Sequence, residues 1–223
     1  MRRRLYLMRH AEVGYFGEGG RPLRPEDVSL TATGERQARA AAEALEGVRF
    51  DRVVTSGLPR TLETAALVAP GLEPESWPEL RELESGRLAD IPDDELENAF
   101  VGVFDGVVPD ATPFLGGETI GSLLDRVLPA LDRLVADDGW NTALAVLHGA
   151  VNRAILSHAL TGERTFLGNF EQAPACINVL DLGPGWIVRA VNVTPYDPAH
   201  LGGRSTTMER LLEQYLPYRK ETR

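Results

Sequence analysis

The chain has 223 residues, 43% of them hydrophobic and 25% charged, which is typical of a globular protein that buries a substantial core. Its formal net charge of −10 argues against nucleic acids and anionic membranes as partners, because binding to either depends largely on a basic surface. The single cysteine, Cys176, excludes an internal disulfide and a multi-cysteine metal site, and it favours a reducing compartment such as the cytoplasm. The apolar stretches are too short to predict a signal peptide or a membrane helix.

Strand-like and helix-like patterns alternate along the chain. In order, they are a strand at 5–8, a helix at 29–48, a strand at 50–56, helices at 58–69 and 117–139, a strand at 142–149, a helix at 150–162, and strands at 176–183 and 185–193. Thr31 or Thr33 caps the first helix, and Pro59 suits the first turn of the second. This alternation predicts an α/β fold, a three-layer α/β/α sandwich whose central sheet is mostly parallel and has helices on both faces. The last two strands follow one another directly and predict a hairpin.

Residues 86–117 interrupt this alternation. They are rich in loop-forming residues and hold one short helical pattern, residues 94–100. We expect them to form a small insertion over one edge of the sheet, within a single domain that spans residues 1–223. The final residues, 218–223, predict a frayed tail.

Basic side chains follow three of the predicted strands, at the point where each strand ends. Arg9 and His10 follow the first strand, Arg60 comes shortly after the second, and His148 lies at the end of the third. In open parallel sheets, ligands bind at the carboxyl ends of the strands, where helix N-termini also point. If these strands are neighbours, the two histidines and two arginines meet at one site, where Gly149 lets the backbone approach an anion closely.

This combination of side chains suits phosphoryl transfer. Guanidinium groups can spread over non-bridging phosphate oxygens, one imidazole can act as the nucleophile, and a second can stabilise the transferred charge as an imidazolium. Each residue alone has a plainer explanation, since a histidine at a strand end is often only solvated. The leaving oxygen also needs a proton donor, and from the residues alone Glu79, Glu82 and Glu84 are all candidates.

Six segments resemble, in the same order, the motifs of the histidine phosphatase superfamily, also called phosphoglycerate mutase-like. They are LMRHAE, LTATGERQA, VVTSGLPRTLETA, LRELESG, GGET followed by Arg126, and LAVLHGAVNR. LMRHAE is similar to the family's Arg-His-Gly signature with alanine as the third residue. The resemblance covers nearly the whole chain, so it is far more specific than the three-residue signature alone.

The resemblance implies a role for each matched side chain. His10 would be phosphorylated transiently, and Arg9, Arg60 and His148 would hold the phosphoryl group. The spacing within LRELESG selects Glu82 as the proton donor to the leaving group, and afterwards as the base that activates water. The resemblance also implies that the reaction needs no metal and no other cofactor.

The loop after the signature departs from the family pattern. Mutases of this family usually carry Ser or Thr there and then an Asn that touches the phosphate, whereas this chain has Val13 and Phe16. An apolar wall argues against the glycolytic mutase and favours a substrate with an apolar or aromatic part. Phe16 and Gly149 then join the two arginines as substrate-binding residues, and residues 86–117 form a lid over the active site that sets specificity.

We therefore expect a phosphomonoesterase that hydrolyses a small organic phosphate through a phosphohistidine on His10, as a histidine acid phosphatase-type hydrolase. A cofactor-dependent mutase, which returns the phosphoryl group to the substrate, is the alternative. A non-catalytic protein that binds a phosphorylated ligand is a second alternative. The expected partner is a small phosphorylated metabolite rather than nucleic acid or membrane, and the oligomeric state is left open, with a homodimer as one alternative.

Overall fold

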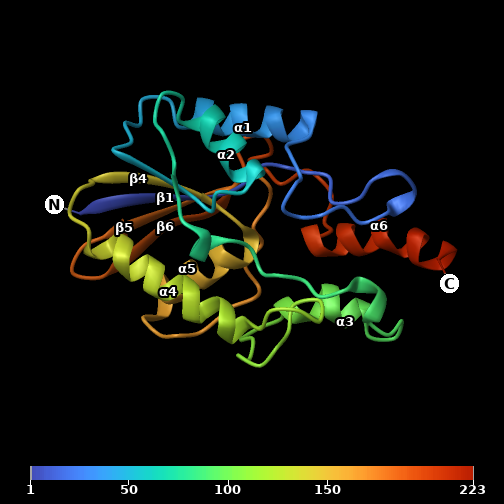
Figure 1. Ribbon diagram of the computed structural model, residues 1–223. Coiled ribbons are helices and arrows are strands. Elements are labelled where there is room, and N and C mark those ends of the chain that lie inside the picture. Colours follow the sequence, from blue (N-terminus) through green and yellow to red (C-terminus); the bar gives the residue numbers. More distant parts are fainter. Residues whose placement is uncertain (1, 223) are drawn as a thin grey trace.

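The computed structural model of the protein describes residues 2–222 (Figure 1). Within these residues a six-stranded sheet has the strand order β3-β2-β4-β1-β5-β6. The first four strands in this order are parallel to one another, whereas β5 pairs antiparallel with both β1 and β6. The strands are β1 (Arg3–Arg9), β2 (Arg52–Thr55), β3 (Glu75–Ser76), β4 (Thr142–Leu147), β5 (Ile177–Leu182) and β6 (Trp186–Val193).

Helices cover both faces of this sheet. The helices are α1 (Ala32–Ala44), α2 (Pro59–Val68), α3 (Leu96–Phe100), α4 (Ile120–Ala136), α5 (Gly149–Thr161) and α6 (Thr207–Glu221). Figure 1 shows α1 and α2 on one face and α4 and α5 on the other. The predicted three-layer fold with a mostly parallel sheet is therefore confirmed, as is the hairpin formed by the last two strands. No helix within residues 2–222 is long and apolar enough to cross a membrane.

β1 is buried because its apolar side chains alternate between the two helical layers. Leu5 and Leu7 pack in the apolar cluster that includes side chains of α4 and α5. Met8 packs on the opposite face, in the cluster that includes side chains of α1 and α2. The strand is thus held from both sides, and the residues that follow it start from a fixed position.

β1 and β4 are neighbours and end at the same level. Arg9 is paired with Leu147, the last residue of β4, and the backbone N–H of His10 donates to the carbonyl of Leu147 at 2.9 Å. The next residue after β4 is His148. The parallel register therefore brings the two histidines to the same edge of the sheet, as the strand ends predicted.

A further group of elements gathers beyond the carboxyl ends of the parallel strands. α3, α6 and the loop that follows β1 lie together there, at the right of Figure 1. A small apolar cluster joins α3 and α6, and its buried members are Ile91, Leu96, Phe100, Leu115 and Tyr215. The short helix predicted within the insertion is α3, so that prediction is confirmed.

The C-terminal segment differs from its prediction as a frayed tail. α6 begins with a capping box and continues to Glu221. Arg219 is buried on this helix, and its guanidinium forms an ion pair with Asp93 at 2.9 Å. The prediction for residues 218–221 was wrong because their sequence is polar and their partners lie in the insertion, far away along the chain. Residue 223 lies outside the described residues.

Candidate active site

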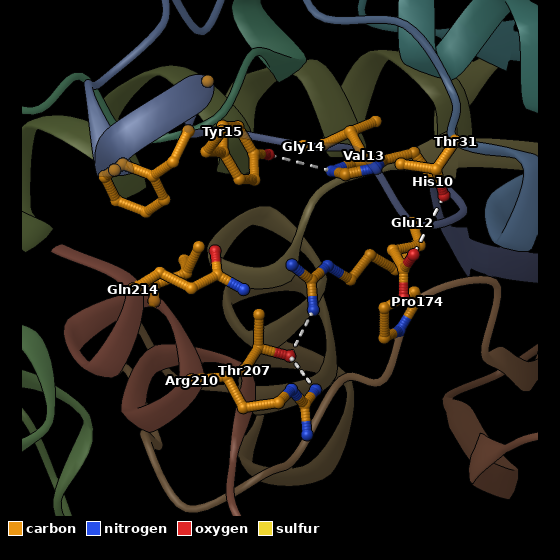
Figure 2. Close-up of a pocket in the computed structure, with 15 residues that line it drawn as sticks. His10, Glu12, Val13, Gly14, Tyr15, Thr31, Pro174, Thr207, Arg210 and Gln214 are labelled. Carbon is orange, nitrogen blue, oxygen red and sulfur yellow. Dashed lines mark hydrogen bonds between the residues drawn. The ribbon is translucent and has the colours of Figure 1, made fainter.

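His10 lies immediately beyond β1, and a backbone carbonyl fixes the position of its ring proton. Nδ1 is 2.8 Å from the carbonyl oxygen of Ala11. Because that oxygen can only accept, Nδ1 carries the proton of the neutral imidazole and Nε2 carries the lone pair. Nε2 faces Tyr15, whose hydroxyl oxygen is 3.5 Å away (Figure 2). This arrangement leaves Nε2 available as a nucleophile.

The ring of His148 lies beside that of His10, with the two centroids 5.3 Å apart. Nε2 of His148 is 2.8 Å from the hydroxyl of Ser56, which is 3.2 Å from the hydroxyl of Thr61. Thr61 gives its own proton to the carbonyl of Leu58, so Ser56 donates to Thr61 and accepts from His148. This chain of hydroxyl groups places the proton of neutral His148 on Nε2, and it leaves Nδ1 buried without a hydrogen-bond partner.

Arg9 and Arg60 bring two guanidinium groups to the site, from the end of β1 and the first turn of α2. Arg60 is 1% exposed, and its Nη1 donates to the carbonyl of Pro25. Arg9 donates through Nη1 to the carbonyl of Gln172 at 2.6 Å and to the hydroxyl of Thr207 at 2.9 Å. The Nε of each arginine is buried without a partner. Two buried cations with unused donors form a site for an anion.

Burial and the neighbouring guanidinium groups keep both imidazoles neutral. Desolvation is the main cause that lowers the pKa of His10 well below its usual value, and the charges of Arg60 and Arg9 add to it. The pKa of His148 is lowered well below its usual value in the same way, first by burial and then by Arg60. At neutral pH His10 is therefore an uncharged base, which is the form that can attack an electrophile.

Glu82 approaches the site from the loop after β3 and lies at the N-terminus of α5. Its two carboxylate oxygens accept from the backbone N–H of Ala150 at 3.2 and 3.3 Å. The other two candidate acids point elsewhere, since Glu79 forms an ion pair with Arg133 at 3.0 Å and Glu84 is exposed. The structure thus brings one of the three predicted carboxylates to the site.

Arg126 holds the backbone segment that carries Glu82. Its guanidinium forms a two-point ion pair with Glu118, with both N···O distances at 2.8 Å. It also donates to three backbone carbonyls, those of Glu79, Arg81 and Glu82. A planar fork that meets several acceptors at once fixes orientation, so Arg126 fixes the direction from which Glu82 enters the site.

Two cavities meet at Arg9. The first has a volume of about 520 Å³, contains His10, and is lined mainly by the loop after β1 and by α6 (Figure 2). The second has a volume of about 470 Å³, contains Glu82, and is lined by α5 and part of the insertion. Gly149 lines the second cavity close to polar groups of the site, since a methyl group on it would lie 3.6 Å from Glu82 Oε2 and 3.8 Å from Arg9 Nε.

The predicted site residues all lie in or directly beside these cavities. Those that line a cavity wall are Arg9, His10, Phe16, Glu82 and Gly149. Arg60 and His148 are buried next to Tyr15 and His10. Part of the Phe16 ring also stacks on Tyr215 of α6, with centroids 6.2 Å apart. Across residues 2–222, no three His, Cys, Asp or Glu side chains are grouped closely enough to hold a metal ion.

Three residues at the site were not predicted from the sequence. Thr207 receives a hydrogen bond from Arg9 but belongs to α6, which the sequence did not predict. Arg153 lies in the second cavity, where its guanidinium is 4.7 Å from the centroid of the Phe104 ring. Tyr15, the third, lines the first cavity beside His10. Arg153 belongs to the segment LAVLHGAVNR, which resembles a family motif, and Tyr15 belongs to the loop after the LMRHAE signature, so both lie in segments that already carried predicted site residues.

The chain matches the family model of the histidine phosphatase superfamily (branch 1) over residues 5–194. Among curated proteins, the probable phosphoglycerate mutase GpmB of Serratia proteamaculans is 33% identical over 166 residues, which are 70% of this chain and 74% of that protein. The uncharacterized phosphatase PhoE of Bacillus subtilis is 27% identical over 183 residues, 79% of this chain and 86% of that protein.

Similar solved structures include the alpha-ribazole phosphatase from Shigella flexneri, with 25% identity and a TM-score of 0.66 over 85% of this chain and 96% of that one. A mycobacterial glucosyl-3-phosphoglycerate phosphatase has 26% identity and a TM-score of 0.65 over 86% and 99% of the two chains. The match over most of the chain, together with the buried histidines and arginines at the strand ends, means that this protein belongs to the histidine phosphatase superfamily.

Proposed function

We propose that this protein is a phosphomonoesterase that hydrolyses a small organic phosphate through a phosphohistidine on His10. The observation that carries the proposal is the state of the His10 ring. Its Nδ1–H is held by the Ala11 carbonyl, and its Nε2 lone pair lies beside two buried guanidinium groups. A neutral imidazole in this position can attack phosphorus while Arg9 and Arg60 bind the phosphoryl oxygens.

In the first half-reaction, Nε2 of His10 forms a bond to phosphorus as the bond from phosphorus to the leaving oxygen breaks. Glu82 supplies the proton that this oxygen takes up, so the alcohol departs neutral. In the second half-reaction, Glu82 takes a proton from water, the water oxygen bonds to phosphorus, and the phosphorus–nitrogen bond breaks. Inorganic phosphate leaves and the imidazole is free again. His148, whose Nδ1 has no partner, stabilises the transferring group once that nitrogen is protonated.

The second cavity would hold the leaving group, because Glu82 must reach the leaving oxygen. The apolar part of its lining supports a substrate with an apolar or aromatic part, and the side chains concerned are Val101, Phe104, Phe114 and Met208. Three of these four belong to the insertion, which supports residues 86–117 as the lid that sets specificity. The similar structures named as phosphatases of alpha-ribazole and of glucosyl-3-phosphoglycerate support hydrolysis of organic phosphates as the reaction.

Mutase activity is the second candidate, and the relatives named as probable phosphoglycerate mutases support it. Both reactions share the phosphohistidine and differ in which acceptor takes the phosphoryl group. Against the mutase stand Val13 and Phe16, which put apolar side chains on the wall beside His10. The two reactions can therefore be distinguished by whether the phosphoenzyme transfers its phosphoryl group to water or to the substrate.

The test is a partition experiment. The enzyme is supplied with 3-phosphoglycerate and 2,3-bisphosphoglycerate, and separately with a panel of phosphate monoesters, while 2-phosphoglycerate and inorganic phosphate are measured. We expect phosphate release to dominate, together with a phosphoenzyme that is lost in acid and absent from His10→Ala. Rapid formation of 2-phosphoglycerate with little phosphate release would establish the mutase instead. A wild-type protein that binds phosphate monoesters without turning them over would support the non-catalytic alternative.

A further inference from the structure

Tyr15 lies on the wall of the first cavity, between His10 and Arg60, and the reaction described above gives it no role. Its hydroxyl oxygen is 3.5 Å from Nε2 of His10, and its ring lies 5.9 Å from the guanidinium carbon of Arg60. Figure 2 shows the hydroxyl pointing at the imidazole from the loop after β1. The Tyr15 hydroxyl is therefore next to the atom on which the phosphoryl group would be carried.

The direction of this contact follows from the tautomer of His10. Because Nε2 holds a lone pair, the Tyr15 hydroxyl can only donate to it. At 3.5 Å the contact is at the long limit of hydrogen bonding and contributes little in the free protein. Burial raises the pKa of the Tyr15 hydroxyl, so the group keeps its proton. The Tyr15 hydroxyl is thus a proton donor beside the nucleophile, and this hydroxyl has no strong acceptor among the described residues.

We propose that Tyr15 is a further catalytic residue, whose hydroxyl donates a hydrogen bond to a non-bridging oxygen of the phosphoryl group while that group is carried on His10. When phosphorus bonds to Nε2, its oxygens project outward from that nitrogen. Because the hydroxyl now points at the lone pair that phosphorus would occupy, the Tyr15 ring must turn slightly aside, and its hydroxyl then lies beside these oxygens and can donate to one of them. This inference rests on the proposed phosphohistidine reaction and adds a donor to it.

The side chains next to Tyr15 in the same loop offer no other hydrogen-bond donor to the cavity. Val13 and Phe16 both line the first cavity, and neither side chain can donate to an anion. Arg9 and Arg60 contact the site from β1 and α2, so without the Tyr15 hydroxyl the part of the wall formed by the side chains at positions 13, 15 and 16 would be apolar. An oxygen bearing negative charge that is buried against such a wall would lack a partner, which is costly.

The test compares Tyr15→Phe with wild type and with a matched control, Tyr6→Phe. Tyr6 is on β1 and packs edge-on against Phe50, outside both cavity walls, so its variant loses the same hydroxyl away from the site. We expect Tyr15→Phe to lower kcat/KM for p-nitrophenyl phosphate by about 10- to 100-fold and to weaken vanadate binding by about 10-fold. The melting temperature should not change, because the hydroxyl makes only one long contact with the other described residues.

Each other outcome has a distinct meaning. If Tyr15→Phe keeps kcat/KM and vanadate affinity within about twofold of an active wild type, Tyr15 is not catalytic and the phosphohistidine reaction stands. If kcat/KM falls but vanadate binds as tightly as to wild type, the hydroxyl does not touch the phosphoryl group and the inference is wrong. If the wild type forms no phosphohistidine at all, the proposed function and this inference fail together.

Discussion

The two buried, neutral imidazoles make the stability of the fold depend on pH. A histidine in the unfolded chain takes up a proton below about pH 6.5, whereas His10 and His148 remain neutral in the fold because burial lowers both pKa values. Below that pH the unfolded chain binds more protons than the folded one, so the free energy of unfolding falls by about 1.4 kcal/mol per pH unit for each residue. From about pH 6.5 to 5.5 the pair together lowers it by about 2 kcal/mol, because a histidine in the unfolded chain is only half protonated at about pH 6.5. This is a large share of the stability of about 5–15 kcal/mol that is usual for a domain.

Urea unfolding in phosphate-free buffers between about pH 7.5 and 5.5, followed by tryptophan fluorescence, measures this slope. Ion-paired carboxylates such as Asp181 and Glu75 also have lowered pKa values, but stability is lost through them only as the pH falls towards about 4 and below. We expect His148→Asn to halve the slope and His200→Asn, at an exposed loop position, to leave it unchanged. A free energy of unfolding that stays constant from pH 6.5 to 5.5 would refute the conclusion that the two imidazoles are buried and neutral.

Three substitutions test the groups around the leaving oxygen. Glu82→Gln should slow alkyl phosphates at least about 10-fold more than p-nitrophenyl phosphate, whose leaving group needs little protonation, and equal slowing would mean that Glu82 is not the acid. Gly149→Ala adds a methyl group 3.2 Å from Arg153 Nη1 and 3.6 Å from Glu82 Oε2, so kcat/KM should fall about 10-fold or more while the melting temperature changes little. Unchanged kinetics would contradict this placement of the site. Arg126→Ala removes the ion pair with Glu118 and the hydrogen bonds to three backbone carbonyls, so the free energy of unfolding should fall by about 2–4 kcal/mol and the hydrolysis of alkyl phosphates should be slowed most. A loss of stability without this dependence on the substrate would show that Arg126 does not position Glu82.

The core of the site was predictable from the sequence because it depends on strand ends. A short apolar run predicts a buried strand, and parallel strands expose their carboxyl ends along one edge. Once β1, β2 and β4 are neighbours, the residues that follow these strands lie close together, and this does not depend on how the side chains of the core pack. Arg9, His10 and His148 follow directly from this rule, and Arg60 needs only the turn into α2.

The rest of the site depends on contacts between segments that are far apart in the sequence. Thr207 reaches Arg9 across 198 positions, and no local pattern marks a threonine for such a contact. α6 itself was missed because most of its length is polar, and its buried face is recognisable only against the insertion that covers it. β3 has two residues, too few for any periodicity. Glu82 could be chosen from three carboxylates only through the family resemblance, since the fork of Arg126 that directs it has no local sequence signal.

The site is positively charged although the whole chain has a negative net charge, and the structure shows how the two are compatible. The net charge is −10, yet Arg9 and Arg60 form no ion pair with a carboxylate among residues 2–222, and the Nε of each is buried without a partner. Most acidic groups are on the outer surface, where water and salt screen them beyond roughly 10 Å, whereas the two guanidinium groups act on their neighbours at short range and in a low dielectric. The same two charges that attract an anion also help to keep His10 unprotonated, so the affinity for the phosphoryl group and the unprotonated state of the nucleophile have one cause. A dianion that enters the site cancels the charges of the two guanidinium groups, which lower the pKa of His148 in the free protein. It therefore favours protonation of His148 at Nδ1, the atom that the hydroxyl chain through Ser56 leaves free.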